Sequence, residues 1–106
     1  MVEVRQHLRL NISINSKVQA IERGHKEFLS IKNLSIGGAF VESNYPYDKE
    51  TLVELEFILP GTDRLIHATG FVSWIKKNEN LNGMGIQFIT ISQKDQEMLK
   101  KFIDDA

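Results

Sequence analysis

Apolar and polar side chains alternate along most of the chain with a period of two residues, which is typical of strands that bury one face. Leucine or isoleucine at positions 8, 10, 12 and 14 alternates with Arg9, Asn11 and Ser13. The segment from Leu52 to Leu59 alternates in the same way, with glutamates at positions 54 and 56 on its polar face. These patterns predict strands, and they place Arg9 on the polar face of the first one.

Turn-forming residues divide the chain into about seven short strands. The predicted strands cover residues 8–14, 17–22, 27–32, 39–43, 52–59, 65–76 and 84–88. Asn15-Ser16 is a predicted turn, and Pro60-Gly61 begins a hairpin turn. Gly70 in the middle of a long strand predicts a bulge or a close backbone approach. Strands at such regular intervals favour an antiparallel barrel or sandwich.

The apolar period becomes helical after residue 91. Ser92 is a predicted helix N-cap, and Asp95, three residues later, is in a position like that of a capping box. The following apolar stripe is expected to dock on the sheet, and a face for a partner or a second copy is the alternative. The stripe consists of Met98, Leu99, Phe102 and Ile103. The predicted fold is therefore mainly β, in one domain over residues 1–106, with a helix over 92–105.

Composition narrows the possible functions. The chain has 106 residues and a net charge of −1, so no global basic field would hold long nucleic acids, and we expect no DNA or RNA partner. It has no cysteine, which suits a reducing cytoplasm. No apolar run approaches 18 residues, and we expect a cytoplasmic protein without a membrane span. A barrel that binds single-stranded nucleic acid is a further class, which the net charge disfavours.

Two stretches carry candidate binding chemistry. Asn33-Leu34-Ser35-Ile36-Gly37-Gly38 offers hydrogen-bonding side chains and two glycines, which reach positive φ easily and leave backbone amides open to a ligand. Arg5 and Arg9 fall on one side of the chain in either an extended or a helical arm. The planar guanidinium suits two phosphate oxygens or the O6/N7 edge of guanine.

Trp74 has two possible positions. Simple alternation places it on the buried face with Ile66, Ala68 and Val72, whereas a bulge at Gly70 would turn it outward. An outward indole could stack on a nucleobase.

Catalysis has little support in the sequence. Ser35 does not lie in a Gly-x-Ser-x-Gly elbow, and the three histidines at positions 7, 25 and 67 lack the spacing of metal ligands. We therefore expect a binding protein without a metal or cofactor, and not an enzyme.

Several motifs together resemble the PilZ domain family. The resemblance covers almost the whole chain and depends on the order and spacing of four motifs. They are Arg-x-x-x-Arg at Arg5 and Arg9, Asn-x-Ser-x-x-Gly from Asn33 to Gly38, Gly-Phe-Val-Ser-Trp-Ile from Gly70, and Gly-Met-Gly-Ile-Gln-Phe ending at Phe88.

The resemblance implies a six- to seven-stranded antiparallel barrel and a non-catalytic receptor for cyclic di-GMP. Arg5 and Arg9 would clamp phosphate and guanine edges from a flexible arm over residues 1–9, beside a barrel over 10–91. Asn33 and Ser35 would read a guanine edge, Gly37 and Gly38 would permit close approach, and Trp74 matches a position that stacks on guanine in some members. Ordering of the arm would signal to a protein partner. The expected state is a monomer or weak dimer.

The family also contains members that do not bind the ligand, so the alternative is a ligand-silent interaction module in motility or pilus assembly. Two positions differ from many members. Asn33 stands where many have aspartate, which predicts weaker contact with guanine N–H donors. Val4 stands where a further arginine is common.

Overall fold

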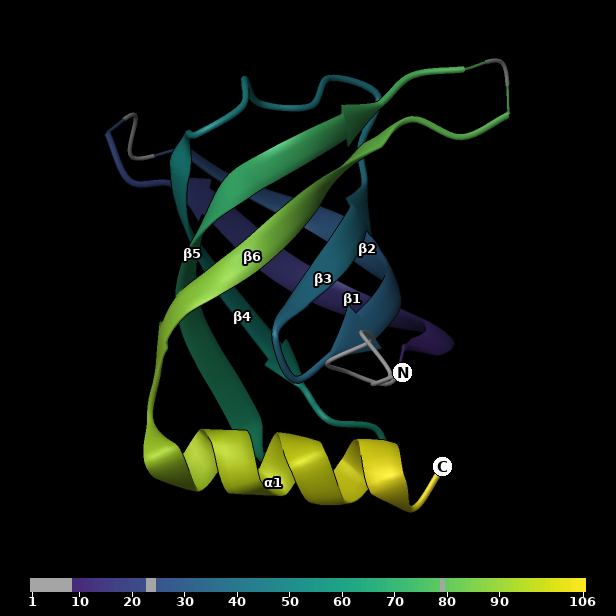
Figure 1. Cartoon of the computed structure of the whole chain (residues 1–106), viewed down its shortest axis with the longest axis vertical. Helices are drawn as coiled ribbons and strands as arrows, with labels where there is room; N and C mark the ends of the chain where they lie inside the picture. The colour runs from purple at the N-terminus through teal and green to yellow at the C-terminus, as the bar shows by residue number, and fades with distance from the viewer. Residues whose placement is uncertain (1–8, 23–24, 79) are drawn as a thin grey trace, which may run out of the picture.

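Six antiparallel strands form a closed barrel in the computed structural model, which describes residues 9–22, 25–78 and 80–106. The elements are β1 (Leu10–Ala20), β2 (His25–Ser35), β3 (Gly38–Glu42), β4 (Leu52–Ile58), β5 (Leu65–Lys76), β6 (Gly83–Ile91) and α1 (Gln93–Asp104). The strands follow the order β1-β2-β3-β6-β5-β4 around the barrel, and β4 pairs with β1 to close it. Figure 1 shows the barrel above α1. The predicted barrel with a C-terminal helix is confirmed, with six strands.

The predicted turn at Asn15-Ser16 is wrong. β1 continues through both residues, and Asn15 pairs with Ser30 while Ser16 pairs with Leu29. The polar side chain of Ser16 is buried, and its Oγ donates a hydrogen bond of 2.7 Å to the carbonyl oxygen of Leu29. That bond satisfies the hydroxyl inside the ladder, so a residue typical of turns is accommodated in a long strand.

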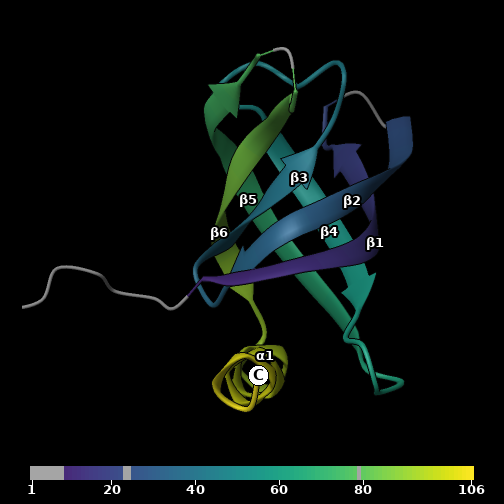
Figure 2. The ribbon, with the colours of Figure 1, turned by 90° about the vertical axis from the view of Figure 1, so that its right-hand side faces the viewer.

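The core fills the barrel with the inward-facing residues of all six strands, as the period of two predicts. Fully buried aliphatic side chains come from β1, β2, β3, β4 and β5, and Met84 contributes from β6. The helix α1 lies across one end of the barrel, which Figure 2 shows with the helix seen end-on. Leu99 and Ile103 are buried in the same core cluster, and Met98 and Phe102 pack against it. The expected docking of the apolar stripe is confirmed.

The start of α1 is attached to β5 and to the turn before it. Ser92 is the N-cap, and its side chain accepts a hydrogen bond of 3.1 Å from the Asp95 amide, as predicted. The Asp95 carboxylate has a different role from the one a capping box gives it. It accepts hydrogen bonds from Nη2 of Arg64 at 2.6 Å and from the backbone N–H of His67 at 3.2 Å.

Burial acts to raise the pKa of Asp95, but its hydrogen bonds and the nearby Arg64 charge outweigh that effect. The pKa of Asp95 is therefore held below the ordinary aspartate value of 3.8. The carboxylate stays ionised at neutral pH and links the helix to the barrel.

No helix in the described part of the chain is long and apolar enough to cross a membrane.

Candidate ligand-binding pocket

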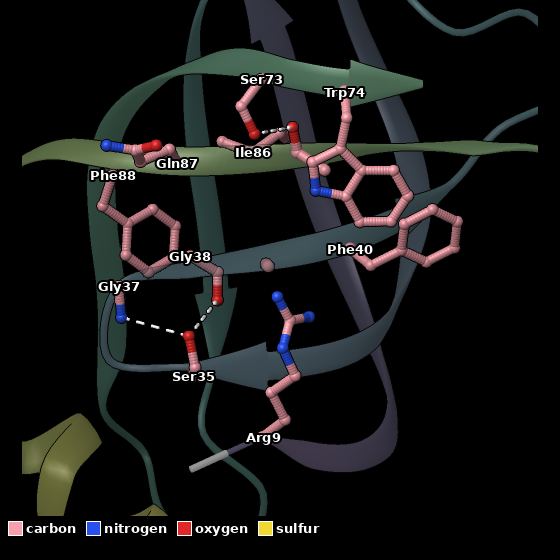
Figure 3. Close-up of a pocket in the computed structure, with 12 residues that line it drawn as sticks. Arg9, Ser35, Gly37, Gly38, Phe40, Ser73, Trp74, Ile86, Gln87 and Phe88 are labelled. Carbon is pink, nitrogen blue, oxygen red and sulfur yellow. Dashed lines mark hydrogen bonds between the residues drawn. The ribbon is translucent and has the colours of Figure 1, made fainter. Parts of the chain in front are cut away.

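A pocket of about 530 Å³ lies on the side of the barrel, between the β2–β3 hairpin and strands β5 and β6. Figure 3 shows its lining side chains. They are Arg9, Ser35, Gly37, Gly38, Ala39, Phe40, Ser73, Trp74, Gly85, Ile86, Gln87 and Phe88. Five of the seven predicted site residues are in this set. Asn33 is not among the lining residues, but it accepts a hydrogen bond from Arg9, which is. Arg5 lies outside the described residues.

The β2–β3 hairpin supplies the lower wall of the pocket in Figure 3. Ser35 ends β2, Gly38 begins β3, and the two are paired across the ladder. The Ser35 Oγ accepts a hydrogen bond of 3.2 Å from the Gly37 amide and donates one of 3.4 Å to the Gly38 carbonyl oxygen. The Ser35 hydroxyl therefore stabilises the turn through two hydrogen bonds to its backbone.

Two expectations about the glycines of this hairpin are wrong. Gly61 is the one glycine with positive φ among the described residues, so neither Gly37 nor Gly38 uses the left-handed region. The Gly37 amide is engaged by Ser35 and is not left open. Gly38 is required for a different reason, because a Cβ there would overlap the carbonyl oxygen of Ile86 on β6. Because Gly38 has no side chain, β3 and β6 can approach each other closely enough to pair.

Arg9 is oriented by a short chain of hydrogen bonds on the outer face of β1 and β2. Its Nη1 donates to Oδ1 of Asn33 at 3.1 Å, and Nδ2 of Asn33 donates to Oδ1 of Asn11 at 3.1 Å. Asn11 and Asn33 are direct cross-strand neighbours. Figure 3 shows the guanidinium extending into the hollow. A guanidinium carries five N–H donors, so one bond can orient Arg9 without exhausting its capacity.

Trp74 points outward, with 40% of its surface exposed. The register explains this orientation. Val72 pairs with Ile86 and Trp74 pairs with Gly85, so Ser73 is an extra residue in β5. A bulge of this kind reverses the alternation, so Trp74 takes the outward one of its two possible positions.

The bulge that turns Trp74 is not the one expected at Gly70. The register does shift beside Gly70, but the extra residue there is Ile89 on β6. Gly70 and Val72 both remain on the buried face of β5, so the alternation is intact until Ser73. The Ser73 Oγ donates a hydrogen bond of 3.3 Å to the Gly85 carbonyl oxygen, which ties the bulge to β6.

Sequence reasoning missed Phe40, which stacks against Trp74. Their ring centroids are 5.2 Å apart and the ring planes differ by 14°. Phe40 lies on β3 and Trp74 on β5, and both are paired with Gly85 on the strand between them. The signal in the sequence is the glycine at position 85, but only the pairing of three strands reveals which rings meet there. Gln87 and Phe88 complete the pocket from β6 and were also missed.

The pocket combines a guanidinium, a hydroxyl and flat aromatic surface. These groups suit a ligand that joins an anionic group to a planar heterocycle. Arg9 is the one charged side chain among the described residues that line the pocket. The described residues contain no group of three or more His, Cys, Asp and Glu side chains that could hold a metal ion.

Comparison with protein families gives a match to the PilZ domain over residues 3–105. The chain belongs to the PilZ domain family. This is a family of cyclic di-GMP receptors, and its domains are generally non-catalytic. A comparison with curated protein sequences gave no significant match.

Solved PilZ structures share the fold at low sequence identity. The Bacillus subtilis inhibitor of motility, MotI/DgrA, is 20% identical with a TM-score of 0.85, over 98% of this chain and 51% of that one. The PilZ domain of YcgR from Escherichia coli, solved with c-di-GMP, is 12% identical with a TM-score of 0.76, over 97% of this chain and 91% of that one. The PilZ domain of CeSA from a cellulose-synthesizing bacterium is 18% identical with a TM-score of 0.66, over 92% and 96%. The chain thus spans about half the length of the Bacillus protein.

Proposed function

We propose that this PilZ domain is a non-catalytic cytoplasmic receptor that binds cyclic di-GMP in the pocket beside the β2–β3 hairpin. The observation that carries the proposal is the convergence of Arg9, Ser35 and Trp74 on one hollow of about 530 Å³. Each comes from a different part of the chain, and each provides chemistry that a cyclic dinucleotide needs. Membership of a family of cyclic di-GMP receptors supports the same ligand.

Each side chain has a distinct part in the proposed complex. The Arg9 guanidinium binds a phosphate or the O6/N7 edge of a guanine, and the exposed indole of Trp74 stacks on a guanine ring. The Ser35 hydroxyl adds a polar contact at the hairpin. Asn33 holds Arg9 in position and offers its own amide to the guanine edge, while Gly37 and Gly38 keep the hairpin free of side chains beside the ligand.

The N-terminal arm completes the site. Arg5 precedes Arg9 by four residues, and we propose that it adds a second guanidinium when the arm closes over the ligand. Ordering the arm reduces the net binding free energy, but it also changes the surface of the protein. A protein partner that recognises the closed arm would receive the signal.

Isothermal titration calorimetry with cyclic di-GMP tests this function. The wild-type protein, shown to be folded by circular dichroism, is expected to give saturable heat in the micromolar range, which corresponds to about −8 kcal/mol. GMP, which has a single guanine and no bridging phosphates, serves as the control and is expected to bind more weakly. Absence of saturable heat at high micromolar cyclic di-GMP would refute the proposal and favour a ligand-silent interaction module.

A further inference from the structure

Two glycines on β6 are covered by aromatic rings outside the barrel. Gly83 and Gly85 flank Met84, which is fully buried in the core. Because a strand alternates its faces, both glycines lie on the outer face of β6, toward solvent. They are nevertheless buried themselves. Something on the outer surface therefore covers them.

The covering groups are the rings of Phe40 and Trp74. A Cβ built on Gly83 would crowd the Phe40 ring as well as the carbonyl oxygen of Val41. A Cβ built on Gly85 would overlap Nε1 and Cε2 of Trp74, and the three atoms nearest to it all belong to the indole. A side chain at position 85 would thus displace the indole, without a backbone atom among its nearest contacts. Gly85 therefore provides the side-chain-free surface on which the indole lies, and we call this contact the seat of the ring.

Phe40 holds the indole from the side. Its neighbours Ala39 and Val41 belong to the core cluster, so Phe40 points out of the barrel, yet only 7% of its surface is exposed. The offset stacking with Trp74, at 5.2 Å between centroids, accounts for part of this burial. Figure 3 shows the two rings together at one end of the pocket, with the Arg9 guanidinium extending toward them.

We propose that Gly85 and Phe40 are positioning residues that fix the Trp74 indole as the stacking platform for a guanine ring. The inference rests on the proposed function, because the ring to be stacked is that of cyclic di-GMP. An exposed tryptophan would otherwise sample several rotamers, and binding would have to immobilise it. The flat seat on Gly85, the Phe40 ring and the Ser73 bulge set the indole in place before the ligand arrives.

The Gly85→Ala variant tests the seat with two readouts. Trp74 is the only tryptophan in the chain, so its fluorescence reports the position of this one ring. We expect an altered emission spectrum without ligand, and an affinity for cyclic di-GMP at least about 5-fold weaker, since loss of base stacking on an aromatic ring costs about this much or more. Thr90→Ala is the matched control, because it is an exposed change on the same strand away from the pocket.

A double-mutant cycle separates positioning from a general structural effect. In a Trp74→Ala background, Gly85→Ala should cause no further loss of affinity, because the ring that it displaces is already absent. An equal loss in both backgrounds would overturn the inference. If Gly85→Ala does not fold, Phe40→Leu takes its place in the same cycle with the same expected outcome.

Two different results separate the role of Gly85 from the receptor function. Wild-type protein that binds cyclic di-GMP while Gly85→Ala binds equally well would refute the seat and leave the receptor function standing. Wild-type protein that shows no binding would refute the receptor function, and the role of the seat with it.

Discussion

Arg9 supplies the positive charge that the described residues bring to the pocket, and its neighbours decide where that charge points. Asn33 accepts from Arg9 and donates to Asn11, so Arg9 and two asparagines on neighbouring strands form one hydrogen-bonded unit. The unit is exposed, which limits its value for stability but leaves it open to a ligand. Substitutions in this unit should therefore change the affinity for the ligand more than the stability of the protein.

Arg9→Ala is expected to weaken cyclic di-GMP binding by about 10- to 100-fold, since hydrogen bonds to charged groups contribute about 1.5–3 kcal/mol. The melting temperature should change little because Arg9 is exposed. Arg9→Lys keeps the charge but loses the planar fork, so its affinity for cyclic di-GMP should fall between those of wild type and Arg9→Ala. Calorimetry on the three proteins checks the order, and an unchanged affinity for Arg9→Ala would remove Arg9 from the site.

Asn33→Asp is expected to tighten binding by a few fold. An aspartate has two charged oxygens, so one can hold Arg9 while the other accepts from guanine N–H donors, and charge-assisted bonds are roughly twice as strong as neutral ones. Asn33→Ala is the comparison and should weaken binding by freeing Arg9. Weaker binding by Asn33→Asp in the same titration would contradict the proposed contact between position 33 and a guanine edge.

The chemistry of individual residues could be predicted where it depends on type and spacing. Arg9, Ser35 and the hairpin glycines were identified in this way, and all of them line the pocket. The conformations were not predictable to the same degree. Gly38 is selected by the approach of β6, a strand nearly fifty positions later in the chain, and no local pattern carries that information.

At the scale of elements, irregularities in the strands place the site. A single extra residue at Ser73 turns Trp74 from the core side to the outer face of β5. Alternation alone gives the opposite answer, because a bulge depends on the partner strand and leaves little trace in the local sequence. Asn15-Ser16 fails as a turn for a related reason, since the long pairing of β1 with β2 overrides local turn propensity.

The Asp95 carboxylate is the element-scale link between α1 and the barrel. Asp95→Asn is expected to lower the free energy of unfolding at pH 7 by about 1.5–3 kcal/mol, because it removes the charge that Arg64 pairs with at 2.6 Å. The pKa of Asp95 is lowered in the folded state, so its contribution is present above the ordinary value of 3.8 and is lost as pH falls through the folded value.

Urea denaturation at pH 7 and again near pH 3 checks this dependence. The difference between wild type and Asp95→Asn should shrink at the lower pH. Asp104→Asn is the control, since its pair with Lys100 is exposed and should contribute little at either pH. A difference that is the same at both pH values would show that the charge of Asp95 is not what stabilises the helix.

A substitution at Leu99 tests whether α1 is packed on the barrel. It is fully buried in the core cluster, so Leu99→Ala is expected to cost about 2–5 kcal/mol in the free energy of unfolding. Lys100→Ala, an exposed change on the next residue, should stay within about 0.5 kcal/mol of wild type. Equal stability of the two variants in thermal or chemical denaturation would mean that α1 is not part of the core.

At the scale of the whole molecule, the residues that anchor the helix are different from those that line the pocket. The helix and its anchor at Asp95 and Arg64 are outside the set that lines the pocket, whereas Ala39 and Ile86 both line the pocket and belong to the core. The closed barrel places β3, β6 and β5 side by side, and these three strands supply most of the residues that line the pocket. Its mainly β character and its C-terminal helix were predictable from periodicity, whereas the count of six strands and the pairing of β3 with β6 depend on contacts between distant parts of the chain.

We propose that cyclic di-GMP binds between Arg9 and Trp74. A fluorescence titration tests it most directly, because the only tryptophan lies in the pocket. We expect a saturable change in Trp74 emission with cyclic di-GMP, and in Arg9→Ala a binding curve shifted to about 10- to 100-fold higher ligand concentrations. No change in the folded wild-type protein at high micromolar ligand, or the same binding curve in Arg9→Ala, would contradict it.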